Sequence, residues 1–244
     1  GPIDTESIGK KKYVVTFIDD YSRKLFVYFI RNKSEVFDKF KEFKTLVENQ
    51  TDRKIKILRS DNGTEYVNND FILFCKRFGI IHQKSAPYTP EQNGVAERMN
   101  RTIIEKSKCL LFDAKLPKCF WAEAFNHACY LINRSVSSVH GMIPDEKFYG
   151  LKVDLSQLKQ FGDEVMVLTP KQNRKKLDEN CQKLTFIGFD PYTKGFRCVD
   201  RITRKITISR HVKFIENFQK IIQAIDVSFE DENDDKNDSI IEIN

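Results

Sequence analysis

Residues 59–66 read Arg-Ser-Asp-Asn-Gly-Thr-Glu-Tyr, and residues 87–100 read Pro-Tyr-Thr-Pro-Glu-Gln-Asn-Gly-Val-Ala-Glu-Arg-Met-Asn. Asp61 follows a short apolar run at residues 55–58 that predicts a strand, and Glu97 lies in the first turns of a predicted helix. Positions 61 and 97 leave thirty-five residues between the two acids. A carboxylate at a strand end and another at a helix start can converge on one divalent cation, because hard cations prefer oxygen ligands.

Each acid also has an ordinary structural interpretation. Asp61 opens an Asp-Asn-Gly sequence, which is strong turn chemistry. Glu97 is a carboxylate in the first turn of a helix, where the helix dipole favours negative charge. Either residue alone favours the structural interpretation, whereas the pair, at this spacing and with these flanks, favours a metal site.

These flanks resemble two motifs of retroelement integrases. Residues 60–63, Ser-Asp-Asn-Gly, resemble the second carboxylate motif, and residues 88–98, Tyr-x-Pro-x-Gln-Asn-Gly-x-x-Glu-Arg, resemble the third, with the family's spacing of thirty-five residues. Phe-Ile-Asp-Asp-Tyr-Ser-Arg at 17–23 and Lys-Gly-Phe-Arg at 194–197 are similar to the copia type of long-terminal-repeat retrotransposon. The resemblance covers roughly residues 1–217, and its four motifs fall in the family's order.

The resemblance implies a metal-dependent polynucleotidyl transferase that trims the 3′ ends of element DNA and joins them to target DNA. Asp61 and Glu97 would be catalytic and would hold Mg²⁺ or Mn²⁺, while Asn62, Gln92 and Asn93 would position substrate. The implied partners are element-end and target DNA and further copies of the chain, with no membrane. The implied place of action is the nucleus, after synthesis in the cytoplasm as part of a polyprotein.

One departure from the family concerns its first catalytic aspartate, which precedes a Gly-Pro pair that here is Gly1-Pro2. The chain as given therefore lacks this carboxylate, by truncation or by loss, and we expect it to be inactive alone. Asp19 and Asp20 are interpreted as ordinary turn residues of a hairpin and not as a replacement. Two alternatives stay open: a non-catalytic or domesticated DNA-binding remnant, and a ribonuclease H-like nuclease without strand transfer.

The order of predicted elements defines the expected fold. Apolar runs at 13–18 and 25–30 predict a β-hairpin, and helix, strand, helix and strand follow. This is the order of an α/β ribonuclease H-like core, a mixed sheet with flanking helices, whose first strand is truncated. Short strands separated by turns then predict a small all-β barrel. The expected division is a catalytic core at 1–150, a linker at 151–160, a putative DNA-binding barrel at 161–217 and an acidic disordered tail or polyprotein linker at 218–244.

Charge supports a polyanionic partner. The net charge is +6, but residues 225–244 hold eight acids and one lysine, and the other 40 basic and 27 acidic residues give +13. A soluble surface with surplus lysine is the plainer interpretation of the same excess. No apolar stretch reaches the roughly twenty residues of a membrane span. The residues expected to contact DNA are basic side chains of the long helix and of the barrel, namely Lys108, Arg174, Lys175, Lys176, Arg197, Arg204 and Lys205.

Overall fold

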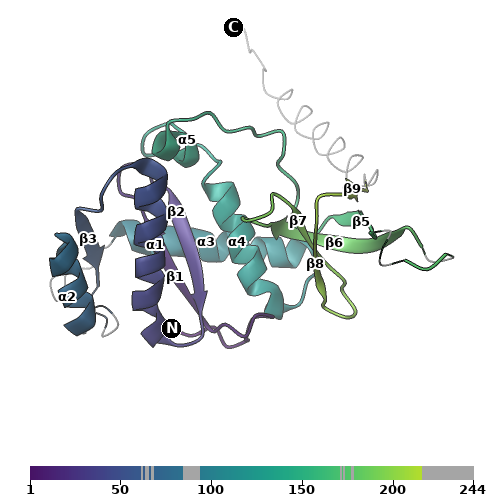
Figure 1. The fold of residues 1–244 in the computed structure, drawn as a ribbon, viewed down its shortest axis with the longest axis horizontal. Coiled ribbons are helices and arrows are strands. Elements are labelled where there is room, and N and C mark those ends of the chain that lie inside the picture. Colours follow the sequence, from purple (N-terminus) through teal and green to yellow (C-terminus); the bar gives the residue numbers. More distant parts are fainter. Residues whose placement is uncertain are drawn as a thin grey trace, which may run out of the picture.

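The computed structural model describes residues 1–61, 63, 66, 69–84, 94–170, 172, 174–176 and 179–215. An α/β part is followed by an all-β part (Figure 1). The helices are η1 (Lys33–Glu35), α1 (Val36–Thr51), α2 (Asn69–Phe78), α3 (Gly94–Asp113), η4 (Lys118–Phe120), α4 (Trp121–Ile132) and α5 (Pro144–Tyr149). The strands are β1 (Tyr13–Ile18), β2 (Leu25–Ile30), β3 (Ile57–Ser60), β4 (Ile81–Lys84), β5 (Glu164–Leu168), β6 (Cys181–Phe189), β7 (Phe196–Val199), β8 (Ile206–Ser209) and β9 (Val212–Phe214).

The β1–β2 hairpin is the centre of the α/β part. Its strands are antiparallel, with Tyr13 opposite Ile30. Val15 and Phe17 face one side and pack with α1 and α2, whereas Val14 belongs to a second cluster with α3 and α4. Helices therefore cover both faces, which explains why both strands are almost continuously apolar.

A second strand pair carries the first predicted motif. β3 and β4 run parallel, with Ile57 opposite Ile81. The apolar pattern predicts that β3 begins at Ile55, but pairing begins two residues later, because the Ile55 amide donates to Glu48 Oε1 at 3.0 Å instead of joining a ladder. Among the described residues, β1 pairs only with β2 and β3 only with β4, so the expected mixed sheet is present as two separate halves.

The helix boundaries follow from local chemistry. Glu35 accepts hydrogen bonds from the Arg31 and Asn32 amides at 2.8 Å each, which forms the capping box before α1. Gly79, with φ of +67°, ends α2 in the left-handed conformation that glycine tolerates best. None of the described helices is long and apolar enough to cross a bilayer.

The all-β part is a five-stranded antiparallel sheet in the order β8-β7-β6-β5-β9, consistent with the predicted small barrel. The sequence predicts strands at 184–189 and 205–209, whereas β6 begins at Cys181 and β8 begins at Ile206. The barrel packs against α4 and the end of α3 through a shared apolar cluster that includes Phe120, Phe161 and Ile187. One of the apolar clusters of the protein thus lies across the junction between the two parts.

His127 lies inside this contact between the two parts. The sequence interpretation of this residue is packing and not metal binding, and its ring is enclosed by aromatic rings of α4 and the barrel, with the Phe161 centroid at 5.5 Å and the Phe186 centroid at 5.7 Å. Burial lowers the pKa of His127 to about 4. The imidazole is therefore a neutral packing group near pH 7.

Candidate active site

Asp61 follows directly on β3. Its Oδ1 accepts the Gly63 amide at 3.0 Å, so the turn chemistry expected of Asp-Asn-Gly is present and directs the carboxylate. The preceding Ser60 is buried; its hydroxyl donates to the Asp61 carbonyl at 2.9 Å and lies 2.9 Å from His82 Nε2 on β4. Burial and the nearby charge of Lys84 lower the pKa of His82. A neutral imidazole on the neighbouring strand thus supports the backbone that carries Asp61, while the Asp61 side chain is exposed.

Glu97 is an exposed residue in the first turn of α3. The position of this turn is set by Asn100, whose Oδ1 accepts a hydrogen bond from the Thr16 hydroxyl of β1 at 2.9 Å. Further along the helix, Met99 and Ile103 pack into the cluster under the hairpin. The helix is thus fixed to the sheet through Asn100, Met99 and Ile103, and Glu97 remains exposed beside this contact.

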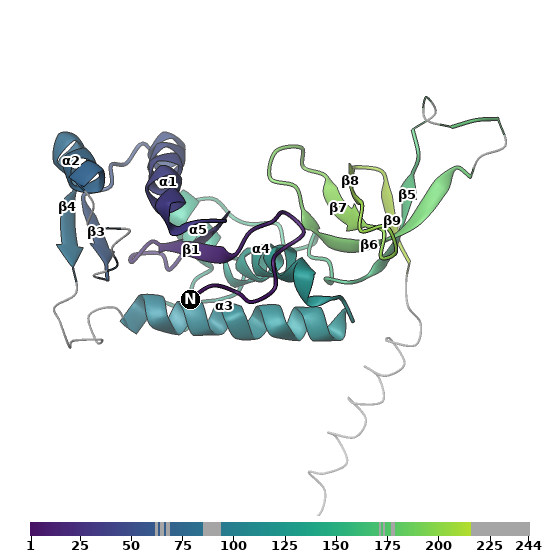
Figure 2. The same cartoon turned by 90° about the horizontal axis from the view of Figure 1, so that it is seen from below.

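Strand β3, which ends next to Asp61, and helix α3, which carries Glu97, approach each other at one end of the α/β part. β3 points toward the beginning of α3, and the carboxyl end of β3 and the first turn of α3 lie side by side in both views (Figures 1 and 2). The shared metal site expected of Asp61 and Glu97 stays a prediction. Asn62, Gln92 and Asn93, expected to position substrate, lie outside the described residues.

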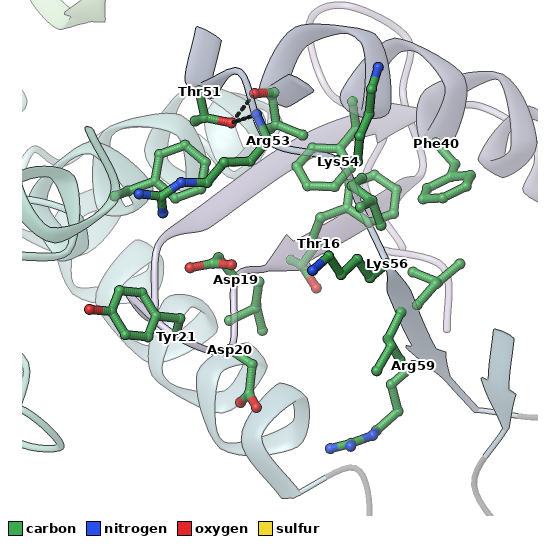
Figure 3. A pocket seen from close by; sticks show the side chains of 18 of the residues that line it. Thr16, Asp19, Asp20, Tyr21, Phe40, Thr51, Arg53, Lys54, Lys56 and Arg59 are labelled. Carbon is green, nitrogen blue, oxygen red and sulfur yellow. Dashed lines mark hydrogen bonds between the residues drawn. The ribbon is translucent and has the colours of Figure 1, made fainter. Parts of the chain in front are cut away.

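A cavity of about 550 Å³ lies between β1 and β3, next to the start of α3 (Figure 3). Asp19 and Asp20 lie on one side of it and Lys56 and Arg59 on the other. Asp19 Oδ2 accepts the Ser22 amide and hydroxyl at 2.8 and 2.6 Å, and Asp20 forms an ion pair with Arg23. Both aspartates therefore serve the turn, as the sequence predicts.

Metal-ligating side chains do not gather in threes in the part of the chain that the structure describes. Asp61 and Glu97 are two carboxylates, and carboxylate oxygens are donors that suit a hard divalent cation. The six cysteines are free thiols, and Cys75, Cys129 and Cys198 are buried.

The predicted DNA-contacting residues fall into two groups. Lys108 is exposed on α3, and Lys175, Lys176, Arg204 and Lys205 are exposed on turns of the barrel. Arg174 is half-buried and donates to Asn180.

Arg197 differs from the other six. Its guanidinium donates to both carboxylate oxygens of Glu123 on α4, at 2.8 and 3.2 Å, and lies 3.8 Å from Asp190. The side chain thus joins the barrel to α4. Its partner is 74 positions away in the sequence, so no local pattern could have indicated it.

Two protein families match the chain in the order of its two parts. Residues 3–90 match the family described as Integrase core domain, and residues 164–221 match the Retroviral polymerase SH3-like domain. Together with the α/β part, the barrel and the paired motifs, these matches show that the chain belongs to the retroelement integrases.

Within that class the chain is similar to plant copia-type elements. It is 48% identical, over 93% of its length, to the retrovirus-related Pol polyprotein from transposon TNT 1-94 of Nicotiana tabacum. It is 37% identical, over 86% of its length, to the Pol polyprotein from transposon RE2 of Arabidopsis thaliana. The chain spans only 17% and 14% of these two proteins.

Solved structures agree on the fold. One match is to a chain in the structure of the simian T-cell lymphotropic virus intasome in complex with the PP2A regulatory subunit B56 gamma. It covers 89% of this chain and 77% of the intasome chain, with a TM-score of 0.51 and 14% identity. The HTLV-2 integrase catalytic core in complex with magnesium matches 58% of this chain and 88% of that chain, with a TM-score of 0.46 and 23% identity. The likeness to the intasome chain supports the predicted fold, an α/β integrase core followed by a small all-β barrel.

Proposed function

We propose that this chain supplies the catalytic core and a DNA-binding barrel of an integrase that trims the 3′ ends of element DNA and joins them to target DNA. The observation that carries the proposal is the position of β3 and α3, because the end of β3 before Asp61 and the first turn of α3, which holds Glu97, lie at the same end of the α/β part. The integrase core match supports the reaction class.

Asp61 and Glu97 would hold Mg²⁺ or Mn²⁺. When bound, such ions activate the attacking oxygen and stabilise the leaving oxygen of an in-line displacement at phosphorus. The chain's own part is to orient the ligands. The Gly63 amide and the buried Ser60 fix Asp61, and the contact between Asn100 and Thr16 fixes the helix that carries Glu97.

A third carboxylate would come from a strand formed by residues on the amino side of Gly1. Three observations support this. β1 and β3 have facing edges that no described strand pairs, and the cavity between them is about 550 Å³. The Ile3 amide donates to the Lys12 carbonyl at 2.8 Å, which already sets the amino-terminal segment beside the start of β1. Gly1 lines a second cavity of about 540 Å³ together with Val14.

The test uses the chain extended upstream so that it includes an aspartate before Gly1. We expect this protein to join a pre-trimmed element end to plasmid DNA with Mg²⁺, and Glu97→Gln to abolish joining. Mn²⁺ binding, followed by electron paramagnetic resonance, should weaken in both Asp61→Asn and Glu97→Gln. Glu105→Gln, a change of an exposed glutamate on the same helix, is the matched control and should retain both binding and joining.

Full joining by the extended Glu97→Gln protein would refute the metal-binding role. Cutting without joining in the extended wild type would instead favour a ribonuclease H-like nuclease. DNA binding with neither reaction would favour a non-catalytic remnant.

DNA would lie across α3 and the barrel. The exposed Lys108, Lys176, Arg204 and Lys205 provide charge for phosphates, and the chain outside residues 225–244 carries +13. Arg197 is left out, because Glu123 occupies its guanidinium. Assembly into multimers of this chain and action in the nucleus, after synthesis within a polyprotein, belong to the same proposal.

A further inference from the structure

Three hairpin tips of this protein are built in the same way. They read Asp-Asp-Tyr-Ser-Arg-Lys at 19–24, Asp-Pro-Tyr-Thr-Lys-Gly at 190–195 and Asp-Arg-Ile-Thr-Arg-Lys at 200–205. In each tip the amide of the first residue donates to the carbonyl of the sixth, at 2.8 to 3.1 Å. In each tip the fifth residue is basic and has a positive φ of 52° to 62°, a conformation that L-residues other than glycine seldom adopt.

The carboxylate of each tip points inward and closes the turn. In the β6–β7 tip, Asp190 Oδ2 accepts the Thr193 amide at 2.9 Å, the Thr193 hydroxyl at 2.8 Å and the Tyr192 amide at 3.3 Å. Asp190 is buried and also lies 3.8 Å from Arg197. Its negative charge is therefore directed away from solvent.

The third residue of each tip projects outward and is large and apolar. Tyr192 and Ile202 are each 92% exposed, and Tyr21 is 65% exposed. Lys147 Nζ lies 4.2 Å from the centroid of the Tyr21 ring and so covers one face of that ring. Tyr192 is thus the tip residue that combines an aromatic ring with nearly complete exposure.

Two cations belong to the β6–β7 tip or are bonded to it. Lys194 is exposed two positions later in the same tip. Arg210, on the β8–β9 turn, donates from Nε to the Thr193 carbonyl at 2.8 Å, which attaches a second cation to this tip. The β6–β7 tip therefore presents one open aromatic ring and two positive charges, with its own carboxylate turned inward.

We propose that Tyr192 stacks on an unpaired base of bound DNA while Lys194 and Arg210 contact the neighbouring phosphates. An exposed aromatic ring with flanking cations is the chemistry that binds single strands, because every base has a π face and every linkage has a charge. Bases inside a duplex have both faces covered by their neighbours, so the stacking partner is a base in a single-stranded end or gap. This inference rests on the proposed function, and it assigns to the barrel a contact with the unpaired part of the DNA substrate.

The test compares two DNA ligands by fluorescence anisotropy over a range of salt concentrations: a blunt duplex, and the same duplex with a short single-stranded overhang. We expect Tyr192→Ala to lower affinity for the overhang ligand on the order of tenfold, within the range for one base–aromatic stack, and to leave the blunt duplex almost unaffected. Tyr192→Phe should bind as the wild type does, because stacking needs the ring and not the hydroxyl. Ile202→Ala removes an equally exposed apolar side chain from a tip of the same build and should change neither ligand.

Equal affinity of Tyr192→Ala and the wild type for the overhang ligand would overturn the proposal, as would an equal loss on both ligands. A Tyr192→Ala protein that keeps its DNA affinity but changes its sedimentation would show that the tip contacts protein instead. These outcomes are distinct from failure of the proposed function, which would appear as weak binding of both ligands by the wild-type chain.

Discussion

Acidification should weaken this protein through His127. The ring is 2% exposed and lies between α4 and the barrel, where burial lowers its pKa from 6.5 to about 4. Because the folded-state pKa is below the unfolded one, the unfolded chain binds the proton first as the pH falls from 6.5 toward 4. Stability is therefore lost in this window and regained above it. With these two pKa values, linkage gives a loss of about 2 kcal/mol between pH 7 and pH 5.

Urea unfolding, followed by fluorescence of the single tryptophan, Trp121, measures this loss. His127→Phe keeps an aromatic ring in the same site but cannot bind a proton, so its stability should fall between pH 7 and pH 5 by about 2 kcal/mol less than that of the wild type. His211→Phe, which changes an exposed histidine, should keep the wild-type pH dependence. If the wild type and His127→Phe lose the same stability over this range, burial does not hold His127 in its neutral form and the reasoning fails.

Three further experiments, with four substitutions, test contacts that hold the fold together. Lys24→Met leaves the buried carboxylate of Asp145 without one of its two cations and should lower the free energy of unfolding by about 3 kcal/mol, measured in urea. Arg197→Ala and Glu123→Ala should each lower the free energy of unfolding by about 2 kcal/mol. A double-mutant cycle should give a coupling energy of at least about 1 kcal/mol. Simple additivity of the two effects would mean that the pair does not join the barrel to α4. Gly162→Ala should free the barrel from the end of α3, because Gly162 has φ of +92° and the new Cβ would lie 2.4 Å from the side-chain carbon of Ala114. The expected result is faster proteolysis between residues 151 and 163. Proteolysis at the wild-type rate would contradict this prediction.

The sequence predicts the elements of this protein well wherever a local pattern determines them. Alternating and continuous apolar runs located the β1–β2 hairpin and most barrel strands, and Asn32 with Glu35 marked the start of the first long helix correctly. The predicted start of strand β3 is two residues early, because its apolar run begins at Ile55 whereas pairing with β4 begins at Ile57. An apolar pattern in the sequence indicates which residues are buried. Strand pairing depends instead on the acceptor to which each backbone amide donates.

The candidate site could be predicted only in part. The strand-end and helix-start positions of Asp61 and Glu97 followed from their flanks. The support from His82 could not be foreseen, because it depends on the register of β3 against β4. The role of Arg197 in joining the barrel to α4 was not predicted either, because the sequence analysis assigned this residue to DNA contact with other basic residues of the barrel.

Helix α3 extends from the proposed catalytic end of the molecule to the barrel (Figure 2). It starts at Gly94, and the residue after its last turn, Ala114, accepts a hydrogen bond from Arg201 of the barrel at 3.0 Å. A helix of this length holds its two ends about 30 Å apart, and each residue added or removed would rotate one end relative to the other by about 100°. The distance and the orientation between Glu97 and the barrel therefore change in fixed steps, one for each residue added to or removed from the helix. Insertions should be tolerated in the loops on either side of α3 far better than within it.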